Sequence, residues 1–242
     1  MKKIGVLLLV CLMSVAAQAG LGLVDDFSGD LSAYTLSRVN DGNGEANVLF
    51  SNVGGDLRVS YSGANKHEQV LFLRDDYTLG VGEMLLATIA HMGDGWDRDL
   101  GIAVGYSETP PALAVGESAD VRTSYVEVSF RSNNQVMTYA RDGATNLASG
   151  QVFPGIVDVL YIMRTGDRDF ALGYINDGVK TLVKSYTITT DPLLGAAIGF
   201  YADVRVAISG SPVGLDNLQI VPEPATMLLL GIGSVLALRR RK

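Results

Sequence analysis

The sequence predicts an all-β fold, an antiparallel β-sandwich, for residues 20–220. Three observations lead to this prediction. Short strand-like runs are separated by turn-forming Gly, Asn, Asp and Pro; several runs place apolar residues at every second position; and no stretch of the region repeats with the period of an amphipathic helix. About a dozen runs at this spacing favour two packed sheets over alternating helix and strand units.

The first half of this region is expected to form four strands, at residues 57–61, 69–73, 84–90 and 100–106. In the first of them, apolar and polar residues alternate, as they do in a strand with one buried face. The last of them is rich in Gly and small apolar residues.

The second half is expected to add hairpins. Residues 125–130 alternate so that Val126, Val128 and Phe130 face the core. Ser132-Asn133-Asn134 joins this strand to one at 136–141. Asn176-Asp177-Gly178, a strong tight-turn signal, joins strands at 170–174 and 179–188. Further strands are expected at 156–164, 196–201, 204–208 and 215–220.

Residues 1–19 are typical of a signal peptide for the Sec export machinery. Two lysines precede an almost unbroken apolar stretch at 4–15, and a small-x-small pattern predicts cleavage between Ala19 and Gly20. The apolar stretch is short for a membrane anchor of roughly 20 residues. Because Cys11 is the only cysteine and lies in this segment, the mature chain has no disulfide and no thiolate chemistry.

The other end carries a segment of three parts, residues 221–242. Pro222-Glu223-Pro224 comes first and is expected to be extended, because its two prolines oppose a helix. An apolar run of 14 residues at 225–238 would make about 21 Å of helix, which is marginal against a hydrocarbon core of about 30 Å. Four basic residues end the chain and would stay on the cytoplasmic side of the inner membrane.

These three parts, in this order, resemble the PEP-CTERM sorting domain of exopolysaccharide-producing Gram-negative bacteria. The resemblance implies that an exosortase-type transpeptidase of the membrane processes the tail near Pro222, Glu223 and Pro224. The precursor would be anchored in the inner membrane, and the product would reach the cell surface or the extracellular matrix. The motif is a substrate and brings no catalytic residue to this chain. An ordinary C-terminal anchor with a chance Pro-Glu-Pro is the alternative.

The body resembles the concanavalin A-like, or laminin-G-like, jelly-roll superfamily in the order of its features. Asp25-Asp26-Phe27 opens the region, a Gly-rich strand runs through 101–105, hairpins follow, and residues 215–220 close the region. The resemblance implies a jelly roll, a fold that hosts glucanases and lyases. Two-sheet sandwiches of other topology are the alternative.

The charge of the chain excludes one class of partner. The formal net charge is −7, from 26 acidic and 19 basic residues, and the body alone is more acidic because the two terminal segments hold six of the basic residues. Nucleic-acid binding depends on Lys and Arg that neutralise phosphates. We therefore expect no nucleic-acid partner.

The body has few residues suited to catalysis, and we expect no enzymatic activity. His67 and His91 are the two histidines, and no Gly-x-Ser-x-Gly elbow presents a serine. The alternative is a secreted glycoside hydrolase or lyase, which usually needs two carboxylates about 5–10 Å apart. The best-placed strand offers Glu127, but its same-face neighbours Tyr125 and Ser129 are not acidic.

Two acidic loops have the composition of a calcium site, since calcium takes six to eight oxygen ligands. Asp25 or Asp26 could add oxygens near a sheet end. The alternative is that these residues only form ordinary β-turns. The candidate ligands are Asp41, Asn43 and Glu45 in the first loop and Asp94, Asp97 and Asp99 in the second.

Trp96, the only tryptophan, lies in the second loop and is a candidate glycan contact. Its ring could stack on a sugar while neighbouring carboxylates accept hydroxyl hydrogen bonds; the alternative is a ring folded over the rim of the sandwich. Tyr125 and Glu127 are further candidate contacts. The sequence therefore predicts an exported, non-catalytic surface or matrix protein that associates with extracellular polysaccharide.

Overall fold

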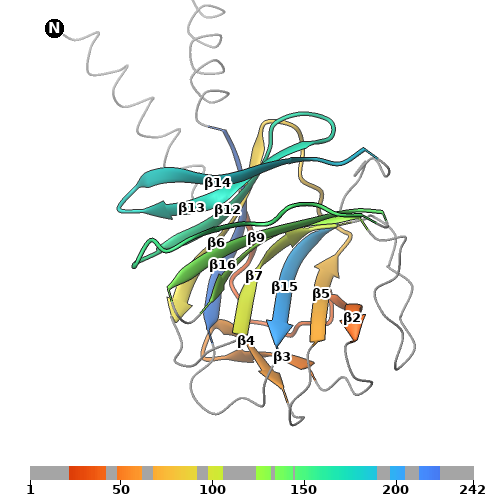
Figure 1. The fold of residues 1–242 in the computed structure, drawn as a ribbon. Helices are drawn as coiled ribbons and strands as arrows, with labels where there is room; N and C mark the ends of the chain where they lie inside the picture. The colour runs from red at the N-terminus through yellow and green to blue at the C-terminus, as the bar shows by residue number, and fades with distance from the viewer. Residues whose placement is uncertain are drawn as a thin grey trace, which may run out of the picture.

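The computed structural model is all-β in the residues that it describes, which are 22–41, 48–61, 68–91, 98–105, 124–131, 134–143, 145–189, 197–204 and 213–223. Its two antiparallel sheets form a sandwich (Figure 1), which confirms the predicted architecture. The predicted signal segment 1–19 and the apolar run 225–238 lie outside these ranges. The described part contains no helix with the length and hydropathy of a membrane span.

Sheet A has the strand order β14-β13-β12-β6-β16-β4-β3, with β1 paired to β16. The last strand, β16, therefore lies inside this sheet, between β6 and β4. The strands are β1 (Leu23–Asp25), β3 (Val48–Val53), β4 (Asp56–Tyr61), β6 (Glu83–His91), β12 (Val159–Arg164), β13 (Asp169–Asn176), β14 (Val179–Thr187) and β16 (Gly214–Pro222).

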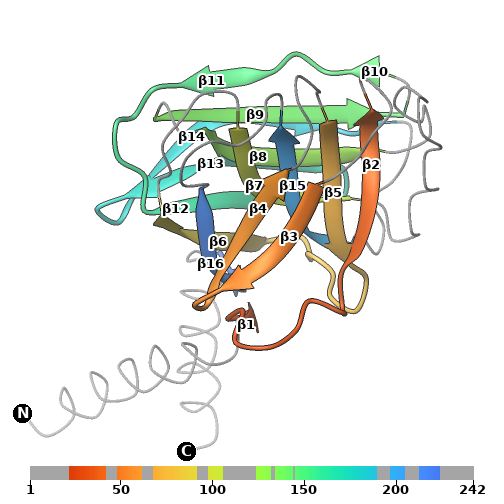
Figure 2. The same cartoon turned by 90° about the horizontal axis from the view of Figure 1, so that it is seen from below.

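Sheet B has the strand order β10-β9-β8-β7-β15-β5-β2, with β11 paired to β9. Figure 2 shows β15 between β7 and β5, while β16, the next strand along the chain, lies in sheet A. The strands are β2 (Thr35–Asp41), β5 (Glu68–Arg74), β7 (Arg98–Val104), β8 (Tyr125–Arg131), β9 (Gln135–Asp142), β10 (Thr145–Asn146), β11 (Gly150–Val152) and β15 (Ile198–Val204).

The core lies between the two sheets and follows the alternation of the strands. On β8, Val126, Val128 and Phe130 are fully buried and belong to the same cluster as Leu85 of β6 and Leu160 of β12. Burial of one such side chain stabilises the fold by about 1.5–3 kcal/mol. The inward face of β8 predicted from the sequence is confirmed.

Both predicted strand pairs are present, β8 with β9 and β13 with β14, and Ser132 and Asn133 of the first predicted turn lie outside the described residues. Asn176 pairs with Val179 across a turn in which Asp177 (φ 49°) and Gly178 (φ 74°) adopt the left-handed backbone that the shortest hairpins require. Asn134, just before β9, is also left-handed (φ 63°).

The two strands predicted at 196–201 and 204–208 differ from the structure. Residues 198–204 form the single strand β15, and 205–208 lie outside the described ranges. Ala202 and Val204 belong to the core cluster, so the alternation continues through Asp203 without a turn. The strands that were not predicted from the sequence are β1, β2, β3, β10 and β11.

Candidate functional site

Tyr125 and Glu127 lie on the face of sheet B that points away from the core, here called the outer face. Their neighbours on β8, such as Val126 and Val128, point into the core, so the odd-numbered residues point outward. In register, Glu127 lies opposite Ala103 of β7. One step along the strands, Ser129 lies opposite Gly101, and Gly101 lies opposite Tyr201 of β15.

Among the described residues, three polar side chains of this face are buried without a hydrogen-bond partner. Glu127, Ser129 and Tyr201 are each 0% exposed. Neither carboxyl oxygen of Glu127 is paired, and neither is the hydroxyl of Ser129 or of Tyr201. A buried polar group without a partner costs about 1–3 kcal/mol, and native proteins keep few of them. The outer face of sheet B thus holds unusual hydrogen-bonding capacity.

Gly101 separates the two hydroxyl-bearing side chains. A Cβ atom at this position would lie 2.0 Å from the carbonyl oxygen of Val128 and 2.4 Å from Cα of Ser129, so no larger residue fits this strand pairing. In the row that joins Ser129, Gly101 and Tyr201, β7 therefore contributes no side chain.

The protonation of Glu127 follows from its surroundings. Burial raises the pKa of Glu127 well above its usual value, and the negative charge of Asp99 raises it further. Burial and the charge of Asp203 likewise raise the pKa of Tyr201. Both side chains are therefore favoured in their neutral forms, in which each can donate a hydrogen bond.

The acidic residues at one end of the face are paired, in contrast to Glu127. Asp99 is 0% exposed, and its two carboxylate oxygens accept hydrogen bonds from Nε (2.6 Å) and Nη2 (2.9 Å) of Arg131. Asp203 accepts a hydrogen bond from the amide of Gln69 (3.0 Å). Because Arg131 already neutralises its charge, Asp99 is a weaker candidate calcium ligand than the sequence indicated.

The other predicted calcium ligands are not brought together within the described residues. Asp41 ends β2, where its backbone pairs with Glu68. Asn43, Glu45, Asp94 and Asp97 lie outside the described ranges. Among the residues that are described, no group of three or more His, Cys, Asp or Glu side chains is placed to hold a metal ion. Calcium at either loop stays a prediction.

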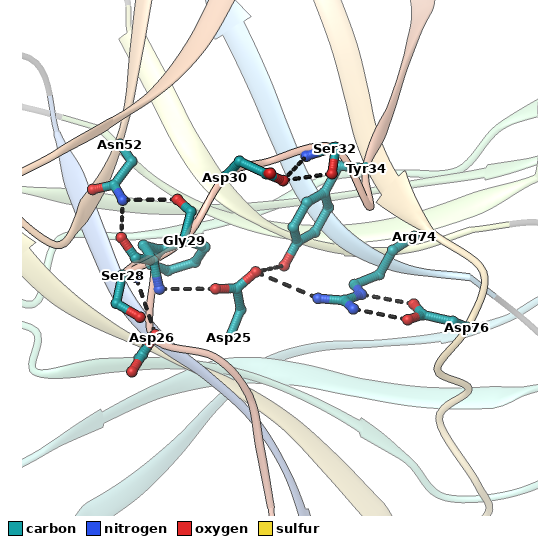
Figure 3. Close-up of polar contacts among 11 residues, drawn as sticks. Asp25, Asp26, Ser28, Gly29, Asp30, Ser32, Tyr34, Asn52, Arg74 and Asp76 are labelled. Carbon is teal, nitrogen blue, oxygen red and sulfur yellow. Dashed lines mark hydrogen bonds and ion pairs between the residues drawn. The ribbon is translucent and has the colours of Figure 1, made fainter.

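The opening Asp25-Asp26-Phe27 motif has a structural role (Figure 3). The carboxylate of Asp25 accepts hydrogen bonds from the Phe27 N–H (2.8 Å), from the Tyr34 hydroxyl (3.0 Å) and from Arg74 (3.4 Å). The Asn52 amide donates to the carbonyl of Phe27. These contacts hold Phe27 in a left-handed conformation (φ 51°) with its ring buried.

The sorting residues lie partly in the fold. Pro222 is the last residue of β16 and pairs with Glu83, and the N–H of Glu223 donates to the carbonyl of Gly82 (2.7 Å). The sandwich therefore extends beyond the boundary predicted at residue 220. Pro224, like Ala19, Gly20 and Trp96, lies outside the described residues.

Sequence reasoning missed Tyr201 and the pairing of Asp99 with Arg131. Alternation in 198–204 places Tyr201 on a polar face, but nothing local indicates which strands flank β15. Those neighbours come from β5 and β7, distant in the chain. Tyr125, by contrast, was identified as a same-face neighbour of Glu127, and the structure buries it on that face (6% exposed).

Comparisons with known proteins agree with both parts of this description. The family model of the PEP-CTERM protein-sorting motif matches residues 221–242. No curated protein sequence matches the chain.

Among solved structures, the metal-free Emp46p carbohydrate recognition domain has a TM-score of 0.51 at 11% identity, over 84% of this chain and 96% of that one. Its potassium-bound form has a TM-score of 0.50 at 9% identity over the same shares. The Bacillus licheniformis β-glucanase has a TM-score of 0.51 at 11% identity, over 84% of this chain and 98% of the enzyme. At these identities the likeness concerns the fold alone. The chain thus joins a body with a jelly-roll-like fold to a PEP-CTERM sorting motif at residues 221–242.

Proposed function

We propose that this chain is an exported protein of the cell surface or extracellular matrix. Its precursor is anchored in the inner membrane and is processed by an exosortase-type transpeptidase. The PEP-CTERM motif at residues 221–242 supports this route, together with the signal peptide predicted at 1–19. The observation that carries the proposal is the presence of that motif directly after a jelly-roll body.

In this proposal the body is not catalytic and binds exopolysaccharide weakly through the outer face of sheet B. Glu127, Ser129 and Tyr201 support this role, because their unpaired groups are the kind that sugar hydroxyls satisfy. These groups are buried, so a glycan reaches them only when neighbouring side chains move aside. That requirement predicts weak binding. Trp96 and Tyr125 remain candidate stacking contacts, and calcium remains a candidate cofactor.

Glycan binding is tested with the soluble chain from residue 20 to Glu223, which retains every described pairing of β16. A glycan array should show binding that Tyr201→Phe weakens severalfold. The matched control is Tyr161→Phe, a buried tyrosine on sheet A. Equal binding by both variants, or no binding by the unmodified chain to any glycan, would contradict the proposed role of the outer face.

A secreted carbohydrate-active enzyme is the second candidate, and one observation favours it. A buried glutamic acid with a raised pKa has the property that a general acid of glycoside hydrolysis needs. Against it, the described same-face neighbours of Glu127 lack a second carboxylate, and Asp99 is engaged by Arg131.

Glu127→Gln separates the two candidates. A neutral Glu127 and a glutamine both donate hydrogen bonds, so a binding protein should keep most of its affinity for the glycan. An enzyme should stop releasing reducing ends from the polysaccharide. Release of reducing ends that Glu127→Gln abolishes would replace the binding proposal with the enzymatic one.

A further inference from the structure

The C-terminal end of β16 is fixed to a rigid turn of the body. The N–H of Glu223 donates to Gly82, which lies in a turn closed by two hydrogen bonds between Gly80 and Glu83. One runs from the Glu83 N–H to the Gly80 carbonyl (3.1 Å), and the other from the Gly80 N–H to the Glu83 carboxylate (2.7 Å). Glu223 is therefore held on the body.

The N-terminal end of the described chain lies at the same place. The carbonyl of Gly22 accepts a hydrogen bond from the Ile220 N–H (2.7 Å), and β1 runs antiparallel to β16 (Figure 2). Gly22 therefore lies beside Ile220, two residues before Pro222. The predicted cleavage site, between Ala19 and Gly20, is only two residues before Gly22.

Two exposed apolar side chains belong to this edge. Val81 is 55% exposed and lies beside Gly82, and Leu23 is 41% exposed and follows Gly22. We call Gly22, Leu23, Val81, Gly82 and Glu223 the exit edge.

The chain between the exit edge and the apolar tail is very short. From Glu223 to Ala225 there are two residues, which span at most about 7 Å. The headgroup layer of each leaflet is about 5–7 Å thick. The tail itself, about 21 Å as a helix, is shorter than a hydrocarbon core of about 30 Å, and such a mismatch draws its ends inward.

We propose that the exit edge rests in the headgroup layer of the membrane while the precursor is anchored, with Val81 and Leu23 in contact with lipid. The partner is thus the bilayer itself, and the proposal relies on the membrane anchoring proposed above. One consequence is that the processing enzyme meets Pro222 and Glu223 as part of a folded domain lying on the membrane.

Single-cysteine labelling of the full-length precursor tests this contact. With Cys11→Ser as background, a polarity-sensitive fluorophore is placed by Val81→Cys or, as a second position, Leu23→Cys. Val179→Cys is the matched control, because Val179 is 66% exposed and lies far from the exit edge. The residues that pair with Val179 in register across sheet A lead to β6 near Thr88, which is about 20 Å along that strand from Gly82. The precursor is reconstituted into phosphatidylcholine vesicles, and quenching by aqueous iodide is compared with quenching by a lipid spin label.

The expected result is iodide quenching about threefold weaker at Val81 than at Val179, with spin-label quenching at Val81 and Leu23 only. Equal iodide quenching at Val81 and Val179 in a precursor that floats with the vesicles would overturn the contact and leave the anchoring intact. A precursor that does not float with the vesicles would overturn the anchoring and the contact together.

Discussion

Two regions of this sandwich bury polar side chains in opposite ways. In the opening segment, the carboxylate of Asp25 is matched by donors from Phe27, Tyr34 and Arg74 (Figure 3). On the outer face of sheet B, Glu127 and Tyr201 are buried with no hydrogen-bond partner. A satisfied network fixes one conformation of the chain, whereas unsatisfied groups lower stability and leave capacity for a ligand. The contrast supports a structural role for the first region and the proposed binding role for the second.

Removing the central acceptor of the opening segment should have the largest effect. Asp25→Ala leaves three donors without their carboxylate, and we expect the free energy of unfolding to fall by about 2–4 kcal/mol. Urea denaturation measures the change. Asp26→Ala is the control, because Asp26 is exposed and accepts a hydrogen bond from the N–H of its near neighbour Ser28, so little change is expected. Equal losses in the two variants would remove the structural role of Asp25.

Removing the unpaired carboxyl group of Glu127 should have the opposite effect and raise the free energy of unfolding. The pKa of Glu127 is about 4.3 in the unfolded chain and is raised in the fold. The stability of the fold is therefore highest below about pH 4.3 and falls as the pH rises from there toward the folded pKa. Glu127→Gln has no such titration. We expect equal stabilities near pH 4 and a variant more stable by about 1–3 kcal/mol at pH 7.

Urea denaturation at the two pH values measures this difference, and the pH 4 experiment serves as the control for packing changes. A variant that is less stable than the parent at pH 7 would indicate that Glu127 has a favourable partner, and the contrast between the two regions would disappear.

Tyrosine-to-phenylalanine substitutions compare the regions with one chemical change. Tyr34 donates to Asp25, so Tyr34→Phe should cost about 1 kcal/mol. The hydroxyl of Tyr201 is unpaired, so Tyr201→Phe should leave the free energy of unfolding unchanged or raise it by up to about 1 kcal/mol. Thermal and urea unfolding of the two variants measure both values. If Tyr201→Phe lowered the free energy of unfolding as much as Tyr34→Phe, the two regions would not differ in the way their polar groups are paired.

The sequence predicted what depends on local pattern. Alternation along 125–130 identified the inward face of β8 and placed Glu127 on the other face, and Asn176-Asp177-Gly178 identified a hairpin. Pairing between distant residues has no local signal: Asp99 meets Arg131 only because β7 and β8 are neighbours in that register. For the same reason, the sequence did not reveal that Glu127 and Tyr201 lack partners.

The sorting tail shows the same limit. Its prolines and basic residues are local signals, and they identified residues 221–242. That Val221 and Pro222 continue β16 depends on their pairing with Met84 and Glu83, more than a hundred residues earlier in the chain.

Calcium binding should have a small effect on stability, and it tests the two acidic loops. An ion present at ten times its dissociation constant stabilises a fold by about 1.4 kcal/mol, which raises Tm by roughly 3–6 °C in a domain of this size. We expect calcium to raise Tm by this amount and EDTA to reverse it. Asp41→Asn and Asp97→Asn assign the ion to one loop, and Asp167→Asn, at an exposed residue that is not a candidate ligand, is the control. Because Asp99 is already neutralised by Arg131, we favour loss of the shift in Asp41→Asn. No shift in the parent chain would leave the acidic loops as ordinary turns, and the binding capacity of the body would then rest on the unpaired groups of sheet B.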